Sequence, residues 1–360
     1  REKDKVIHLS LKIPDETERR IIWQTFSKQY KFIAHMNWGE FASKFRFTPG
    51  QIKDALELAE LNAAGSKNIA DGIGSDCLIS ACYQSGKSYL ISKARKIESR
   101  YGWEDIILHD DAMELLKAAC NQMKFRQTVF GDWGFGKRLS YGKGLSILFS
   151  GPPGTGKTMA AQVVAKELQL ELYKVDISKL VSKYIGDTEK NLEEIFDEAQ
   201  LSNAILFFDE ADAIFGRRTE VKDSHDRHAN VETAYLLQRM EEYEGITILA
   251  TNYLKNIDEA FLRRFGFVID FPFPDAAYRE KIWRSMLPEE TPAAENIDFS
   301  FIAKKFELSG GNIKNIVVSA AFIAAEKNES VGTCHIIKAA LRELHKIGKM
   351  IISDELEEYL

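Results

Sequence analysis

The sequence contains few cysteines and no long apolar run. Only four of its 360 residues are cysteine (Cys77, Cys82, Cys120 and Cys334), and their spacing forms neither a C-x-x-C pair nor a metal site. We therefore expect buried thiols in a reducing compartment and no zinc site. The longest apolar stretches, such as residues 204–208, are far shorter than the ~20 residues that cross a bilayer, and no leader-like segment opens the chain. These absences predict a cytoplasmic protein with no membrane partner.

The sequence also lacks an excess of positive charge. Its formal net charge is −6, with 45% hydrophobic and 28% charged residues, which is typical of a folded protein of two or three compact units. Binding to nucleic acid usually requires a basic stripe, which this composition does not provide. The charge balance therefore predicts no nucleic-acid partner.

A glycine-rich segment lies between an apolar run at residues 145–150 and a helix-forming run at residues 159–168. Its glycines allow the backbone N–H groups to face inward at a helix N-terminus, where the macrodipole favours phosphate. The pattern predicts the phosphate-binding loop of a nucleotide-hydrolysing protein. The residues expected to bind the nucleotide here are Gly151, Pro152, Pro153, Gly154, Thr155, Gly156, Lys157, Thr158 and Met159.

Polar residues after two further apolar runs complete a catalytic pattern. Lys157 is expected to reach the β and γ phosphates, and the Thr158 hydroxyl to hold Mg²⁺. Asp209 is expected to contact the ligands of the metal rather than the metal itself. Glu210 is expected to act as the base for the attacking water or to orient that water. Asn252, at the end of a later run, is suited to positioning that water beside the γ-phosphate.

Five apolar runs alternate with helical stretches and predict an α/β fold. Their near-continuous apolar character is expected of parallel strands that helices cover on both faces. Functional residues should then lie at the carboxyl ends of the strands. The five strands are expected at residues 145–150, 170–176, 204–209, 246–252 and 267–271.

The pattern becomes helical after residue 273, and the start of the chain repeats it. Pro14-Asp15, Arg19 and Ile22-Trp23 match Pro274-Asp275, Arg279 and Ile282-Trp283. We therefore expect a second lid-like unit at the start, and a chain that begins inside a longer protein with an upstream module. The expected domains are a helical lid-like unit (1–100), a helical linker (101–130), a large α/β domain (131–273) and a small helical lid (274–360).

Two further segments have candidate roles at the nucleotide. The ring of Phe135 and the backbone of Gly136 lie in a turn-rich segment and could meet a purine, although a plain loop with core aromatics fits equally well. Arg263 and Arg264 suit the highly charged transition state of phosphoryl transfer, where an arginine supplied in trans has a large effect. If they cannot reach the nucleotide of their own protomer, ATP lies between protomers of a closed ring.

Together these motifs resemble the AAA+ ATPases, and within them the AAA clade of protein remodellers, over residues 131–349. The resemblance implies a P-loop NTPase fold with a five-stranded parallel sheet and a C-terminal helical lid, with ATP and Mg²⁺ as cofactors. It makes residues 151–158 Walker A, residues 206–210 Walker B, Asn252 sensor 1, and the arginine pair the arginine fingers. It also implies a homo-hexamer.

The resemblance further implies a central pore that grips a protein substrate. The gripping loop is then Lys183, Tyr184, Ile185 and Gly186, in which the aromatic ring contacts an extended chain without reading its side chains. Residues 217–230 fit a second pore loop or a solvated connector equally well. At the lid position where other AAA+ clades carry a sensor 2 arginine, this sequence has Gly311, so no cation is assigned there.

More narrowly, the segments around Tyr184, residues 223–230, residues 235–245 and residues 309–315 resemble the AAA+ ATPase found with phage-tail-like contractile injection systems. That resemblance implies assembly or remodelling of particle components. Two alternatives remain open from the residues: a nucleic-acid motor or loader of the same fold, and a scaffold that binds ATP only to assemble.

Overall fold

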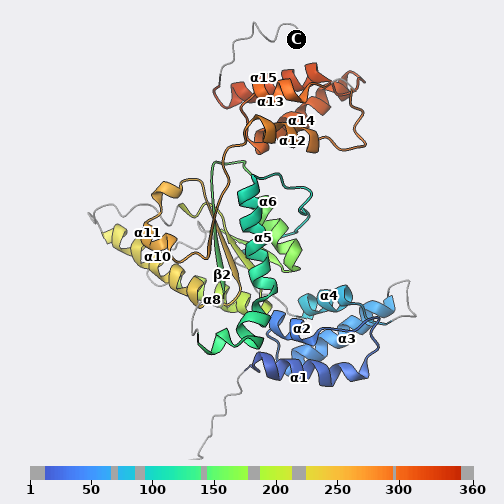
Figure 1. Ribbon diagram of the computed structural model, residues 1–360, viewed down its shortest axis with the longest axis vertical. Helices are drawn as coiled ribbons and strands as arrows, with labels where there is room; N and C mark the ends of the chain where they lie inside the picture. Colours follow the sequence, from blue (N-terminus) through green and yellow to red (C-terminus); the bar gives the residue numbers. More distant parts are fainter. Residues whose placement is uncertain are drawn as a thin grey trace, which may run out of the picture.

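The computed structural model describes residues 13–65, 72–85, 94–138, 144–176, 187–212, 224–294 and 297–349. Three units follow one another along the long axis of the molecule (Figure 1). Helices α1 to α4 lie at one end, a sheet with its covering helices lies in the centre, and helices α12 to α15 lie at the other end. Within the described ranges, every helix is too short or too polar to span a membrane.

The central sheet has six strands in the order β1-β3-β4-β5-β2-β6. The strands β2 to β6 are parallel to one another, which confirms the five predicted parallel strands. The sixth strand, β1, pairs antiparallel with β3 at the edge. The bounds are β1 Ala94–Ile97, β2 Leu145–Ser150, β3 Leu172–Val175, β4 Ile205–Phe208, β5 Ile246–Thr251 and β6 Phe267–Asp270.

Strand β1 corrects two predictions, the five-stranded sheet and the purely helical character of residues 1–100. Its sequence is Ala-Arg-Lys-Ile and only Ala94 is buried, so it has neither an apolar run nor an apolar alternation that would indicate a strand. Exposed charges of this kind are common on edge strands, where they discourage pairing with other chains. The sheet of the central domain therefore begins before residue 100.

Helices cover both faces of the sheet, as predicted. Helices α5 (Asp110–Lys124) and α6 (Lys157–Leu168) lie on one face, and α8 (Asp187–Ser202) and α10 (Ser224–Glu242) on the other (Figure 1). Successive strand residues alternate between the two cores that result.

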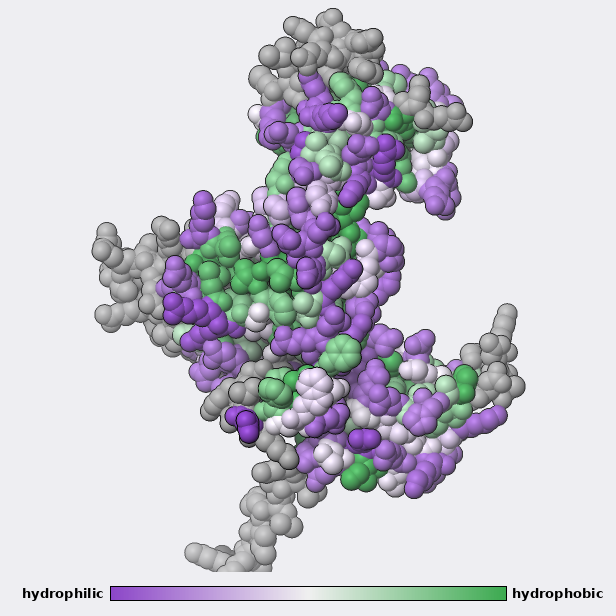
Figure 2. Space-filling model, viewed as in Figure 1, coloured by the Kyte–Doolittle hydropathy of each residue, from purple (hydrophilic) through white to green (hydrophobic). Residues whose placement is uncertain are grey.

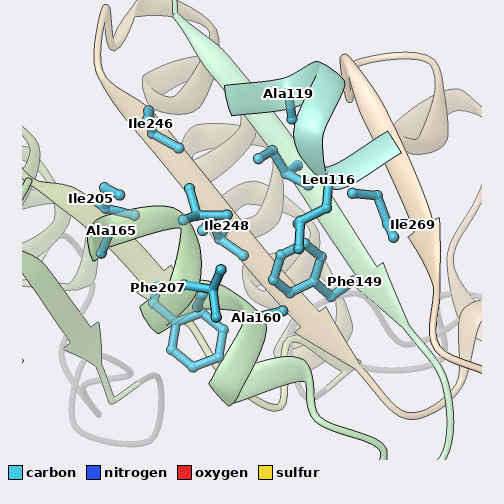
Figure 3. Packing of buried hydrophobic residues seen from close by; sticks show 14 of the residues in the cluster. Leu116, Ala119, Phe149, Ala160, Ala165, Ile205, Phe207, Ile246, Ile248 and Ile269 are labelled. Carbon is cyan, nitrogen blue, oxygen red and sulfur yellow. The ribbon is translucent and has the colours of Figure 1, made fainter. Parts of the chain in front are cut away.

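Helix α5 belongs to the core of the central domain, although the sequence places it in a linker. Its residues Leu116 and Ala119 are fully buried against Phe149 and Ile269 of the sheet and Ala160 of α6 (Figure 3). Burial of this kind is worth about 25 cal/mol per Å² of apolar surface, so α5 stabilises the sheet rather than merely joining two units.

The two helical end units are built alike. The N-terminal unit has α1 Glu16–Phe26, α2 Trp38–Lys44, α3 Pro49–Gly65 and α4 Ser75–Ser85, and the C-terminal lid has α12 Ala276–Ser285, α13 Phe299–Lys305, α14 Gly310–Glu326 and α15 Thr333–Lys346. In the first unit, Arg19 donates from Nε to the carbonyl of Ala42 (2.8 Å) and from Nη1 to that of Pro14 (2.5 Å). In the second, Arg279 donates to the corresponding carbonyls of Ala303 (2.9 Å) and Pro274 (2.6 Å).

The equivalence extends to the start of each unit. Asp15 and Asp275 cap the first helices by accepting hydrogen bonds from backbone N–H groups, and Trp23 and Trp283 are both fully buried. The internal repeat seen in the sequence thus corresponds to one helical arrangement used twice, at opposite ends of the molecule (Figure 1).

Polar contacts join the N-terminal unit to the far end of α6. Tyr83 donates to the carbonyl of Gln169 (2.7 Å), and Lys44 donates from Nζ to the carbonyl of Leu168 (3.3 Å). Lys44 is only 7% exposed, and this burial lowers its pKa to about 8. The buried ammonium group therefore makes the stability of this interface depend on pH.

Replacing Lys44 with methionine is expected to remove that dependence. Between pH 8 and about 10.4, the unfolded chain holds a proton on Lys44 that the folded chain does not, so stability rises with pH across this window. The full change is worth about 3 kcal/mol. Urea unfolding of the wild type between pH 7.5 and 10.5 should show the rise, and Lys44→Met should show a flatter profile.

The exposed Lys53 of the same unit provides a matched control, because its side chain is 64% exposed. Lys53→Met should keep the wild-type slope. Equal slopes for Lys44→Met and the wild type would contradict the buried-lysine interpretation.

Candidate functional site

The glycine-rich loop follows β2 directly, at the carboxyl edge of the sheet. Gly151 has φ +142°, and a Cβ there would lie 2.1 Å from the carbonyl oxygen of Phe271, so only glycine fits. Gly154 has φ +78° and contacts the lid. Helix α6 then begins at Lys157, after Gly156, which has no side chain to cap the first turn. Its free N–H groups and the helix dipole form a site suited to phosphate.

The side chain of Lys157 lies inside this loop. Its Nζ donates to the carbonyls of Gly151 (2.6 Å) and Pro152 (2.9 Å) and to Oδ1 of Asn252 (3.0 Å). Lys157 is 7% exposed, and burial lowers its pKa, while Asp209 and Asp212 act in the opposite direction. The loop thus holds a buried cation for which a phosphate group is a stronger acceptor than two carbonyls.

The acidic residues Asp209 and Glu210 directly follow β4, beside the loop. Asp209 accepts a hydrogen bond at Oδ1 from the backbone N–H of Glu210 (3.1 Å) and a hydrogen bond at Oδ2 from Lys174 (2.6 Å). Glu210 has φ +55°, in the left-handed region that costs an ordinary residue roughly 1–2 kcal/mol, and its side chain is exposed. Strained backbone of this kind is concentrated at functional sites.

Asp212 links these residues to the end of β5. Its Oδ1 accepts hydrogen bonds from the Thr251 hydroxyl (3.2 Å) and the Asn252 backbone N–H (3.3 Å). Asn252 in turn contacts Lys157. The structure therefore brings Lys157, Asp209, Glu210 and Asn252 together at one edge of the sheet, as the sequence predicts for residues at the carboxyl ends of parallel strands.

The residues present fit a bound nucleotide with Mg²⁺. The buried ammonium of Lys157 and the uncapped start of α6 suit the phosphates, and Thr158, whose hydroxyl the sequence predicts to hold the metal, lies in the first turn of α6. In the described part of the chain, no group of three His, Cys, Asp or Glu side chains could hold a metal by itself. A metal here would depend on phosphate and water oxygens, as Mg²⁺ usually does.

A small cavity beside the loop was not found from the sequence. It is lined by His109 at the start of α5, Thr155 of the loop, and Tyr278 and Gly310 of the lid. The rings of His109 and Tyr278 lie 4.1 Å apart, and the buried Nε2 of His109 has no hydrogen-bond partner among the described residues. The unpartnered ring nitrogen lies next to the phosphate site and is suited to a hydrogen bond with a nucleotide base, whereas the cavity itself, at about 30 Å³, is smaller than a base.

The structure does not bring Phe135 and Gly136 to the phosphate loop, where the sequence predicts that they meet the base. Gly136 lines a cleft with Gln169 and Glu244, at the carboxyl end of α6, and Arg126 nearby donates to the Glu244 carbonyl (2.7 Å). Helix α6 has 12 residues and is about 18 Å long, so this cleft lies far from the phosphate loop. Phe135 is half exposed in the adjacent turn. The prediction is corrected because a turn close to the loop in sequence joins the opposite end of β2.

The lid also reaches the phosphate loop. The backbone N–H of Gly311 donates to the carbonyl of Gly154 (3.0 Å), and buried Ser309 caps α14 at the same place. The first turn of α14 therefore contacts the loop through its backbone, consistent with the absence of a cation at residue 311.

The arginine pair lies away from this site. Both side chains are exposed at the end of α11 (Glu259–Leu262), and Nε of Arg264 lies 3.3 Å from Oε1 of Glu241. The carbonyl of Arg264 accepts a hydrogen bond from the hydroxyl of Ser146, near the start of β2 (3.3 Å). Gly151 is five residues further along the chain, about 16 Å at the rise of a strand. The two arginines therefore lie near the end of β2 that is opposite to the phosphate loop of their own protomer.

Two predicted loops cannot be placed. Lys183, Tyr184, Ile185 and Gly186 lie outside the described residues, immediately before α8. Residues 217–223 also lie outside them, whereas residues 224–230 of the predicted loop belong to helix α10.

Comparison with known proteins identifies the central domain. Residues 147–273 match the family model "ATPase family associated with various cellular activities (AAA)". The chain is 31% identical over 283 residues to a katanin p60 ATPase-containing protein of Danio rerio (71% of this chain, 56% of that protein). It is 33% identical over 234 residues to "Proteasome-activating nucleotidase 1" of Halobacterium salinarum (62% and 55%). It is 30% identical over 257 residues to "ATP-dependent zinc metalloprotease FtsH" of Lachnoclostridium phytofermentans (69% and 43%). The chain thus spans about half the length of these relatives.

Proposed function

Because the chain carries an AAA ATPase domain, we propose that it uses ATP hydrolysis in a ring of identical protomers to remodel or thread protein substrates. The domain itself is an Mg²⁺-dependent ATPase with ATP as its nucleotide, as the sequence predicts. The ring, its hexameric size and the protein substrate are the proposed parts.

One observation carries the proposal of a ring: the arginine pair lies about 16 Å along β2 from the phosphate loop of its own protomer. An arginine side chain cannot cover this distance. The arginines are nevertheless exposed and so are accessible to the nucleotide of a neighbouring protomer. Apolar side chains also gather on the surface of the central domain (Figure 2), which suits a contact between protomers.

The residues at the sheet edge divide the chemical work between them. Lys157 and the N–H groups of the loop bind and orient the phosphates, and Glu210 takes a proton from the attacking water. Asn252, held by Asp212, orients that water. Bound Mg²⁺ supplies charge that stabilises the transferring phosphoryl group. Arg263 and Arg264 of a neighbouring protomer complete the site.

Threading requires a loop that grips the substrate, and we assign this role to residues 183–186. These residues directly precede helix α8, which begins at Asp187 and lies with α10 on one face of the sheet. The similarity to "Proteasome-activating nucleotidase 1" supports a protein substrate for this chain.

Replacing Tyr184 with alanine is expected to separate ATP hydrolysis from threading. The ring of Tyr184 provides apolar contact area but no catalytic group, so ATPase activity should stay within about threefold of the wild type while unfolding of a tailed green fluorescent protein falls at least tenfold. Tyr253→Ala, on an exposed tyrosine of the same domain, is the control. Unfolding at the wild-type rate by Tyr184→Ala would remove residues 183–186 from the mechanism.

The finer role, assembly or remodelling of contractile injection particles in the cytoplasm, rests on the sequence segments that resemble that group of ATPases. Four unpaired cysteines support the reducing compartment. Electron microscopy of particles formed with and without the active ATPase tests this role, because particles of unchanged number and length would exclude it.

A further inference from the structure

Lys174 is a cation at the catalytic edge that the roles described above do not use. It lies on β3 opposite Phe207 of β4, between the buried residues Tyr173 and Val175. A lysine in a strand that is otherwise apolar is unusual, because strands of a parallel sheet are covered on both faces. Its side chain is 39% exposed, and its Nζ lies 2.6 Å from Oδ2 of Asp209.

The ion pair with Lys174 engages the carboxylate of Asp209, which is expected to help bind the metal. Asp209 is 22% exposed and has both oxygens engaged, Oδ1 by the Glu210 N–H and Oδ2 by Lys174. Lys157 is close enough for Asp209 to affect its pKa. Lys174 and Lys157 therefore offset two of the three negative charges of Asp209, Asp212 and Glu210 before any metal arrives.

A divalent cation entering this edge meets an Asp209 carboxylate that is already paired with an ammonium group. Either Lys174 moves away from Asp209, which breaks a charge-assisted hydrogen bond, or the ammonium stays next to the metal, which repels it. Both alternatives weaken metal binding. An incoming triphosphate has the opposite effect, because its negative charge is attracted to Lys157 and Lys174 together.

We propose that Lys174 is a positioning residue that competes with Mg²⁺ for Asp209, so that the metal binds well only together with the nucleotide. The inference rests on the proposed role of Asp209 at the metal. Lys174 thereby increases the gain in nucleotide affinity that Mg²⁺ provides, since binding of metal and nucleotide are reciprocally coupled.

The test measures the dissociation constant of fluorescent mant-ADP in excess Mg²⁺ and in EDTA. The ratio of the constant in EDTA to the constant in Mg²⁺ reports the coupling. Lys174→Met should lower the ratio about tenfold from the wild-type value, within the range of typical couplings, because the metal then binds better without nucleotide. Lys174→Gln, which keeps a donor to Asp209 without the charge, should also lower it, whereas Lys174→Arg should keep the wild-type value. Lys166→Met, on an exposed lysine of α6, is the matched control.

The variant Asp209→Asn distinguishes a failure of the role proposed for Asp209 from a failure of the role proposed for Lys174. If this variant has the same ratio as the wild type, Asp209 does not serve the metal and the proposed function loses that residue. If Asp209→Asn lowers the ratio but Lys174→Met and Lys174→Gln equal the wild type, only the inference about Lys174 fails. Should Lys174→Met not fold, Lys174→Gln provides the same comparison.

Discussion

Replacing Arg264 with alanine should lower kcat for ATP hydrolysis about 10³-fold or more, while the affinity for nucleotide stays within a few fold of the wild type. Arg264 lies about 16 Å along the strand from its own phosphate loop, so it adds little to nucleotide binding by its own protomer. Its charge acts on the transition state at the neighbouring site. Phosphate release and mant-ATP binding measure the two effects, and Arg263→Ala tests the second arginine in the same way.

Mixing two inactive variants tests whether the arginine acts between protomers. Lys157→Ala removes the ammonium group that binds the phosphates but keeps Arg264, whereas Arg264→Ala keeps Lys157. A mixed ring contains some sites with an intact loop from one protomer and an arginine from the next, so activity should reappear on mixing. Arg284→Ala, on an exposed arginine of the lid, is the control and should remain active. Absence of recovery in rings shown to be mixed would mean that the arginine acts within its own protomer.

Replacing Glu210 with glutamine should lower the hydrolysis rate by about 10²- to 10⁴-fold and leave nucleotide binding nearly intact. Glutamine has the same shape but cannot accept a proton from water. The backbone of Glu210 has φ +55°, and its N–H donates to Asp209. We expect the glutamine side chain to start from the same backbone position.

The experiment compares phosphate release with mant-ATP affinity in the same preparation. Glu242→Gln, on an exposed carboxylate of α10, provides the control and should hydrolyse ATP normally. A Glu210→Gln protein with wild-type turnover would show that another group activates the water, and would favour the scaffold alternative.

The sequence predicts the parallel sheet and the phosphate loop well because their signals are local. Apolar runs mark buried strands, and the glycines of residues 151–158 mark a backbone that must take positive φ values. Asn252 and Glu210 could be placed because each comes within two residues of the end of a strand, and parallel strands end at one edge.

Features that depend on tertiary contact could not be predicted. His109 and Tyr278 are far apart in the sequence, and only the docking of the lid brings their rings together. Phe135 and Gly136 precede the phosphate loop closely in the sequence, but strand β2 separates them from it, and Gly136 lies in a cleft with Gln169 and Glu244. Strand β1 is short and charged, and its pairing with β3 leaves no periodic pattern.

The internal repeat shows where sequence and structure agree most closely. Arg19 and Arg279 were matched by position alone, and each makes the same pair of hydrogen bonds to carbonyls within its own unit. The reason is physical, because a buried guanidinium must satisfy its N–H groups, and so its partners are retained with it.

The central claim is that ATP is hydrolysed at a seam between two protomers. Its most direct test is the ATPase rate per protomer over a dilution series, with the assembly state measured by mass photometry in the same samples. We predict that the rate per protomer falls steeply as rings dissociate and is lost in single protomers. A single protomer that hydrolyses ATP at the full rate would contradict the account.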